Sequence, residues 1–222
     1  MTGGGAVSDS GDGAAGRAPR VSVLMTCHNA AATIEESVRS VIAQTYGDWE
    51  LVLVDNASTD ESVSIVERLG EPRIVIHRLG RNIGRTPALN EGLRHCRGEY
   101  LAILDADDVS EPSRLARQVA VLRDHAHVAL VATGSHDIDG SGDITRTVSL
   151  EGDSLAIRRR LAYNCPIVHS SVMCRLTMVQ DAGGYPVRFA YAQDAALWLG
   201  LARRGPIVAI SEPLVRIRRT AT

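Results

Sequence analysis

Three carboxylate side chains occur within four positions at the end of an apolar run. Asp105, Asp107 and Asp108 follow the segment 100–104, whose almost wholly apolar character is typical of a strand buried on both faces of a parallel sheet. Carboxylates this close repel one another, so the cluster favours a bound cation. Divalent ions such as Mg²⁺ or Mn²⁺ are held by one or two carboxylates together with phosphate oxygens of a substrate. The cluster therefore predicts a metal site completed by a phosphorylated ligand. The simpler alternative is that Asp108 and Ser110 only cap the next helix.

The elements expected around this cluster alternate between strand and helix. Apolar runs predict strands at 21–26, 51–54, 74–77 and 100–104. Helix-start patterns lie between these runs, namely the capping boxes Thr33 with Glu36 and Ser58 with Glu61, and the pair Thr86 and Pro87. This alternation predicts an α/β fold with a Rossmann-like, mostly parallel sheet and helices on both faces.

Two further polar segments are expected at the same edge of the sheet. Ligands of such sheets bind at the carboxyl ends of the strands. Asp55 follows the second expected strand, and the loop 78–85, which contains three arginines, follows the third. Arginines in such a place suit an anion or an aromatic ring. The alternatives are that Asp55 is a turn residue and that the arginines belong to a solvated loop.

The second half of the chain has a different pattern. A strand is expected at 128–132, and the turn 139–142 between short polar strands predicts a small antiparallel subregion laid over the first sheet. One helix is expected at 153–161, and it ends in the arginine run 158–160. Another helix begins around Asp194, for which the simplest interpretation is a helix cap.

The composition excludes several classes of protein. All 24 basic residues are arginine, which excludes a P-loop lysine and a Schiff-base lysine. A net charge of -2 gives no support for nucleic-acid binding. The four cysteines lack metal-ligand spacing, and no apolar stretch of about 18 residues or signal peptide is found. These features predict a cytoplasmic protein, with a disordered segment at 1–20 and a single domain at 21–222.

Ordered blocks along the chain resemble family 2 glycosyltransferases. The blocks are 21–29, 40–46, 53–60, 81–84 with 88–92, 105–108, 164–166 with 169–173, 183–185, and 194 with 197–199. The resemblance implies the GT-A fold, a nucleotide-sugar donor, a divalent cation and inversion at the anomeric carbon. Within the domain, residues 21–110 would form the nucleotide-binding half and residues 111–222 the acceptor half.

The resemblance also implies roles for residues of the donor site. Asp55 would accept a hydrogen bond from the nucleotide base, which is expected to be uracil. Thr26 and Asn29 would line the same pocket. Arg81 would contact the base or the diphosphate, and Asp105 would bind hydroxyls of the ribose or the sugar.

Further roles concern the metal and the acceptor. By resemblance, Asp107 would hold Mn²⁺ or Mg²⁺, and Asp194 would be the catalytic base that deprotonates the acceptor hydroxyl. His169, Gln193 and Trp198 would lie on the acceptor side, although a structural hydrogen bond is the alternative for His169. Gln193 stands where many relatives have Glu, which would make Asp194 a weaker base or alter an acceptor contact.

These residues predict a metal-dependent inverting glycosyltransferase that moves one sugar from a UDP-sugar to a hydroxyl acceptor in the synthesis of a surface or secreted glycan. The acceptor would be a glycan, a lipid-linked molecule or a small molecule. The alternatives are a catalytically weak nucleotide-sugar-binding protein and a sugar-phosphate nucleotidyltransferase. The arginine run 158–160 and the arginine-rich tail predict peripheral contact with the inner face of an anionic membrane. The oligomeric state is left open.

Overall fold

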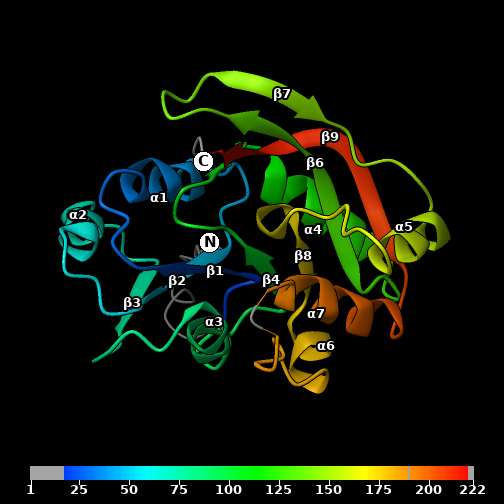
Figure 1. Ribbon diagram of the computed structural model, residues 1–222, viewed down its shortest axis with the longest axis horizontal. Helices are drawn as coiled ribbons and strands as arrows, with labels where there is room; N and C mark the ends of the chain where they lie inside the picture. The colour runs from blue at the N-terminus through cyan, green and yellow to red at the C-terminus, as the bar shows by residue number, and fades with distance from the viewer. Residues whose placement is uncertain (1–17, 190, 220–222) are drawn as a thin grey trace, which may run out of the picture.

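The computed structural model describes residues 18–189 and 191–219. The segment 1–20, for which disorder is predicted, lies outside these residues except for its last three. Within the described residues the strands are β1 (Val21–Cys27), β2 (Trp49–Asp55), β3 (Ile74–Arg78), β4 (Tyr100–Ile103), β5 (Val109–Ser110), β6 (Leu130–Ile138), β7 (Ile144–Val148), β8 (Met173–Arg175) and β9 (Ile207–Arg218). The helices are α1 (Ile34–Ile42), α2 (Ser62–Arg68), α3 (Arg85–Leu93), α4 (Arg114–Asp124), α5 (Ser154–Leu161), the 3-10 helix η1 (His169–Ser171), α6 (Leu176–Asp181) and α7 (Gln193–Ala202) (Figure 1).

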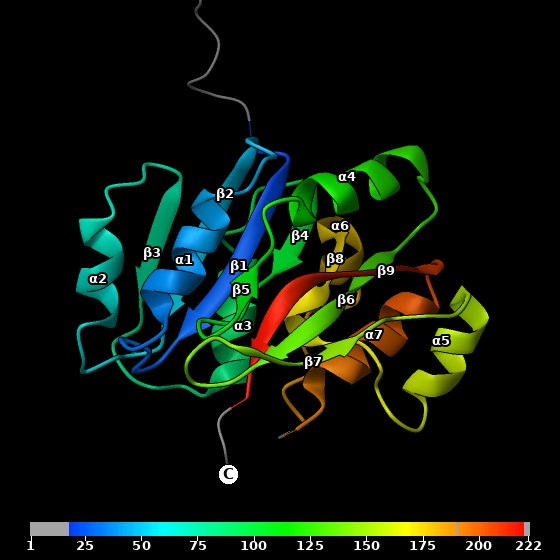
Figure 2. The same ribbon diagram turned by 90° about the horizontal axis from the view of Figure 1, so that it is seen from above.

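The first half of the chain forms the predicted parallel sheet. Strands β3, β2, β1 and β4 are neighbours in that order, and each adjacent pair is parallel (Figure 2). Cys27 at the end of β1 is paired in register with Asp55 at the end of β2, so the carboxyl ends of these strands lie at one edge.

Both faces of this sheet are covered by helices, because successive side chains of a strand point to opposite faces. Val23 and Met25 of β1 pack into an apolar cluster with residues of α1, α2 and α4. Leu24, which lies between them, packs into a second cluster with residues of α3, α5, α6 and α7. The continuous apolar runs of the sequence therefore correspond to strands buried on both sides.

The second half of the chain extends the same sheet. Strand β8 pairs antiparallel with β4 and with β6, and β9 then runs parallel to β6. The predicted antiparallel subregion is the β6–β7 hairpin, together with β5, which pairs antiparallel with β9. Since β5 spans Val109–Ser110, the expected boundary at residue 110 falls within a strand that is paired with the last strand of the chain.

The predicted helix caps do not form as expected, because hydroxyl groups serve other contacts or the helix begins at another residue. Helix α1 begins directly after Thr33, as predicted, but the Thr33 hydroxyl donates to the carbonyl oxygen of Ala106 at 3.0 Å and makes no cap hydrogen bond. The Ser58 hydroxyl accepts the N–H of Asn29, and α2 begins only at Ser62. Helix α3 begins at Arg85, one residue before the predicted cap, and α4 begins at Arg114, beyond Asp108 and Ser110.

Helix α4, with 11 residues, is the longest helix in the described part of the chain. No helix within 18–189 and 191–219 has both the length and the apolar character needed to cross a membrane.

Candidate active site

A cavity of about 690 Å³ lies at the carboxyl edge of the parallel strands. Its walls come from the end of β1, the start of α1, the loop before α3, the segment after β4 and the end of β9. This volume is in the range of cavities that bind cofactor-sized ligands. The cavity therefore lies where an open α/β sheet is expected to bind its ligand.

Most residues predicted for the donor site lie at this cavity. Thr26, Asn29, Asp105 and Asp107 line it. Asp55 is 5% exposed and lies at the end of β2.

The carboxylate of Asp55 accepts the N–H of Ser58 at 3.0 Å and faces the thiol of Cys27 at 3.7 Å. Burial, followed by the nearby charge of Asp55, raises the pKa of the Cys27 thiol to about 12. Arg81 is exposed and does not line the cavity.

Arg85, from the same loop as Arg81, lines the cavity. One of its guanidinium nitrogens lies 2.8 Å and 2.7 Å from the two carboxylate oxygens of Asp105. The Nδ1 atom of His169 lies 3.1 Å from Asp105, and its Nε2 atom lies 3.0 Å from the hydroxyl of Tyr185. With Nδ1 protonated, His169 donates to Asp105 while Nε2 accepts from Tyr185. These four side chains form one continuous network.

The three acids differ in pKa because their surroundings differ. Burial alone raises the pKa of Asp105, but His169 and Arg85 outweigh this effect and hold that pKa well below its usual range. Burial and then the charge of Asp105 raise the pKa of Asp107. The same two causes raise the pKa of Asp108 to about 7.

Asp108 has a structural position in the acidic segment. Its carboxylate accepts the backbone N–H of Arg218 at 3.0 Å and the hydroxyl hydrogen of Ser170. The Ser170 hydroxyl oxygen in turn accepts the N–H of Asp105 at 3.0 Å. Asp107 lacks such partners, because it makes no ion pair and accepts no hydrogen bond from another described residue.

A second cavity, of about 590 Å³, adjoins the first at Gly84 and Arg85. Asp194 lines this second cavity from the first turn of α7. The residue before α7, Ala192, has a left-handed backbone with φ 57° and supplies no side-chain cap. Among the described residues, the carboxylate of Asp194 accepts only the N–H of the adjacent Ala195, at 2.8 Å. The interpretation of Asp194 as merely a helix cap is therefore wrong.

The three residues predicted for the acceptor side lie in different surroundings. Gln193 is 9% exposed and lines the second cavity beside Asp194. His169 is buried within the network with Asp105 and Tyr185. Trp198 lines neither cavity, because it is fully buried behind these side chains, with its ring centroid 6.2 Å from that of His169 and 6.3 Å from that of Tyr185. Trp198 therefore does not reach the surface of either cavity.

Comparisons with known proteins agree with this geometry. The family model described as Glycosyl transferase family 2 matches residues 22–180. EpsE of Bacillus subtilis (strain 168) is 33% identical over 192 residues, covering 84% of this chain and 68% of that protein. UDP-Glc:alpha-D-GlcNAc-diphosphoundecaprenol beta-1,3-glucosyltransferase WfgD of Escherichia coli is 28% identical over 194 residues, covering 86% of this chain and 73% of that protein.

Solved structures share the fold. S. aureus TarS 1-349 in complex with UDP-GlcNAc has a TM-score of 0.78 at 20% identity, over 91% of this chain and 59% of that chain. Mannosyltransferase PcManGT from Pyrobaculum calidifontis, in complex with GDP-Man and Mn²⁺, has a TM-score of 0.67 at 25% identity, over 92% of this chain and 57% of that chain. This chain therefore spans less than two thirds of both solved chains. The match of the family model over most of its length, on a GT-A fold, shows that the chain belongs to glycosyltransferase family 2.

Proposed function

We propose that the chain is a metal-dependent, inverting glycosyltransferase that moves one sugar from a UDP-sugar to a hydroxyl acceptor. The observation that carries this proposal is the pair of adjoining cavities, one containing Asp105 and Asp107 and the other containing Asp194. The name of WfgD includes a UDP-Glc donor and a diphosphoundecaprenol-linked acceptor, which supports a UDP-sugar here. The two halves of the domain, 21–110 and 111–222, would serve donor and acceptor respectively.

Asp107 suits Mn²⁺ or Mg²⁺ at the donor cavity. Its carboxylate faces the cavity without a partner, and burial together with Asp105 raises its pKa, so a cation would relieve an unfavourable charge. Among the residues described, no three His, Cys, Asp or Glu side chains form a metal centre by themselves. This agrees with an ion that is held by few carboxylates and by substrate phosphates. When bound, the ion would neutralise charge on the departing diphosphate.

The remaining donor residues would orient the nucleotide and the sugar. Asp55, at the end of β2, would accept a hydrogen bond from the base, with Thr26 and Asn29 beside it in the cavity. Asp105 would accept hydrogen bonds from hydroxyls of the ribose or the sugar. Arg85 holds the Asp105 carboxylate ionised and fixed in orientation, so this acceptor is preorganised before the donor binds.

Asp194 would act as the catalytic base. The acceptor hydroxyl oxygen would attack the anomeric carbon from the face opposite the diphosphate, while Asp194 takes the hydroxyl proton. The bond from the anomeric carbon to the phosphate oxygen breaks, its electron pair leaves with the nucleoside diphosphate, and the configuration inverts. General-base assistance of this kind contributes roughly 10²- to 10⁴-fold to a rate.

Two substitutions separate donor binding from transfer. We expect Asp107→Asn to lose most Mn²⁺-dependent UDP binding in calorimetry. Asp194→Asn should keep that binding and lose transfer from a panel of UDP-sugars by roughly 10²-fold or more. Asp181→Asn, on the exposed end of α6, is the matched control and should change neither quantity. Full transfer by Asp194→Asn would remove the proposed base.

The same assays test the main alternative. Gln193, beside Asp194 in the second cavity, is the residue that favours a nucleotide-sugar-binding protein with weak or absent transfer. That alternative predicts donor binding by the unsubstituted protein without turnover of any donor in the panel.

A further inference from the structure

Exposed apolar side chains are concentrated near α5 and just before α7, and those before α7 line the second cavity. Tyr163 is 93% exposed and Tyr191 is 88% exposed, and both are far more accessible than the tyrosines of the core. Three other large apolar side chains close to these tyrosines in sequence are exposed, namely Leu155, Val187 and Phe189. Elsewhere in the described residues, the exposed large apolar side chains are Val75 and Ile144. Val187, Phe189 and Tyr191 also line the cavity that contains Asp194. These three exposed side chains therefore lie at the proposed acceptor entrance.

Arginines without carboxylate partners occur in two segments of the sequence, 153–163 and 187–204. Those in 153–163 are Arg158, Arg159 and Arg160, and those in 187–204 are Arg188, Arg203 and Arg204. Elsewhere in the described residues, only Arg68, Arg81 and Arg114 lack such a partner. The carboxylates within the two segments are Asp153, which caps α5, and Asp194, which lies in the cavity. The surface carries a net positive charge.

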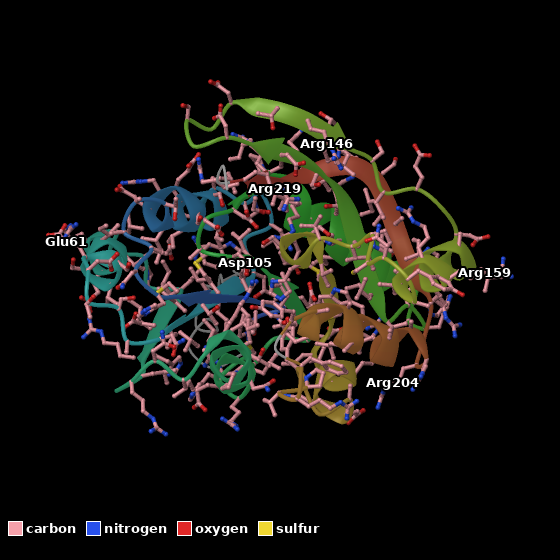
Figure 3. The ribbon with its side chains drawn as sticks, viewed as in Figure 1. Glu61, Asp105, Arg146, Arg159, Arg204 and Arg219 are labelled. Carbon is pink, nitrogen blue, oxygen red and sulfur yellow. The ribbon has the colours of Figure 1, made fainter. Side chains whose placement is uncertain are left out.

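The two segments are neighbours in space. Ile157 of α5 and Leu201 of α7 belong to one apolar cluster, and the Ser154 hydroxyl accepts the N–H of Ile207, just beyond α7. Figure 1 shows α5 beside α7. In Figure 3, Arg159 and Arg204 both project outward on this side of the molecule. We call the exposed surface of residues 153–163, 187–189 and 191–204 the α5–α7 face.

The arginines of the tail, for which membrane contact was also predicted, are paired with carboxylates of the protein. Arg216 pairs with Glu111, Arg218 with Glu36, and Arg219 with Asp137. These arginines are engaged within the fold, and the tail is thus not a comparable cationic surface.

We propose that the α5–α7 face binds the surface of an anionic lipid bilayer and brings a lipid-linked acceptor to Asp194. This inference rests on the proposed transferase function. Exposed tyrosine rings suit the headgroup level of a bilayer, because each ring is apolar and ends in a polar hydroxyl. Arginines without carboxylate partners suit its phosphates and its negative potential. Because Val187, Phe189 and Tyr191 of this face line the second cavity, a bilayer on this face would bring a lipid-linked hydroxyl to the cavity that contains Asp194.

Sedimentation with vesicles tests the proposal in the full chain. Empty phosphatidylcholine vesicles, with and without 30% phosphatidylglycerol, serve as probes at about 50 mM and about 500 mM salt. We expect binding to the anionic vesicles only, weakened at high salt. The triple variant R158Q/R159Q/R160Q should reduce partitioning by roughly 100-fold, since each arginine contributes about fivefold. The variant Y163S/Y191S, which keeps the charge, should also bind less.

A matched variant shows whether vesicle binding depends on the α5–α7 face or only on the total positive charge of the protein. R39Q/R78Q/R123Q removes the same charge from exposed sites on α1, β3 and α4 and should bind vesicles nearly as well as the parent. Equal losses in the two triple variants, or no binding of the parent to anionic vesicles, would overturn the proposal. The proposal would also be overturned if the α5–α7 face bound an acidic protein and did not bind anionic vesicles.

Failure of this inference is distinguishable from failure of the proposed function. The vesicles contain neither donor nor acceptor, so their binding does not depend on transfer. UDP binding with Mn²⁺ by R158Q/R159Q/R160Q reports on the donor site alone and should equal that of the parent.

Discussion

The acids at positions 105, 107 and 108 share a residue type but differ in their neighbours. Asp105 faces Arg85 and His169, and it is therefore ionised and fixed. Asp108 accepts backbone and hydroxyl hydrogens, which hold the acidic segment in place. Only Asp107 is left facing the cavity without a partner. A cation therefore has one carboxylate available without disrupting existing contacts.

Substitution of Arg85 tests the orientation of Asp105. Arg85→Gln removes the charge that holds this carboxylate, so the pKa of Asp105 should rise and donor affinity should fall. Hydrogen bonds to charged groups contribute about 1.5–3 kcal/mol, which corresponds to a roughly 10- to 100-fold loss in affinity for the UDP-sugar. Calorimetry with Mn²⁺ present measures this loss.

Arg81→Gln is the control for Arg85→Gln. Arg81 belongs to the same loop but is exposed and lines neither cavity, so its loss should change affinity by less than about threefold. Similar losses for both variants would show that the loop acts only through its overall positive charge.

The role of Arg85 could not be predicted from the sequence. Its partners Asp105 and His169 are 20 and 84 residues away in sequence, and nothing in the local pattern distinguishes Arg85 from Arg81. The acids themselves could be predicted, because an apolar run that ends in carboxylates is a local signal. A side-chain pair across the sheet edge depends on loop geometry, which the sequence pattern does not specify.

Strands β1, β2 and β4 are anchored at the edge opposite the cavity. The Ser22 hydroxyl donates to Glu50 at 2.7 Å and accepts the N–H of Gly98 at 2.8 Å. Glu50 is nearly fully buried and pairs with Arg97 at 2.6 Å. These contacts set the start of β4, and the position of Asp105 beyond its end follows from them.

Gly98 permits this close approach of two backbones. A Cβ atom at residue 98 would lie 2.5 Å from the backbone nitrogen of Ser22 and 2.9 Å from the carbonyl oxygen of Tyr100. Because backbone atoms cannot move aside as a side-chain end can, Gly98→Ala should lower the free energy of unfolding by about 1–3 kcal/mol. Urea unfolding followed by circular dichroism measures the change.

Gly47→Ala is the matched control for Gly98→Ala. A Cβ atom at residue 47 would meet nothing within 4 Å, so the substitution should be neutral or stabilise by up to about 1 kcal/mol. An equal loss of stability in both variants would show that the contact with Ser22 does not determine the effect.

Strands were easier to predict than helix starts. Uninterrupted apolar runs such as 51–54 and 100–104 mark buried strands because the whole run must leave water. The hydroxyls of Thr33 and Ser58 are potential caps in sequence, but the structure uses them to join distant loops. The insertion of the three-residue β8 between β4 and β6 has no comparable local signal.

Strand β9 connects distant parts of the molecule through Arg218. Its guanidinium donates to the carbonyl oxygens of Asp107 and Asp139, at 3.2 Å and 3.0 Å, and pairs with Glu36 at 2.6 Å. The Arg218 side chain is 8% exposed and lines the donor cavity. A single residue near the end of β9 thus holds α1, the acidic segment and the β6–β7 turn together.

Replacing Arg218 should loosen the whole molecule. In Arg218→Met the carbonyl oxygens of Asp107 and Asp139 lose their donors inside the fold, so we expect unfolding to become easier by about 2–3 kcal/mol. Arg219→Met is the neighbouring control, because Arg219 is 59% exposed and its pair with Asp137 contributes at most about 1 kcal/mol. Urea unfolding of both variants gives the comparison. If Arg218→Met unfolds no more easily than Arg219→Met, β9 is held by its strand pairing with β6, and the closure of the donor cavity does not depend on this arginine.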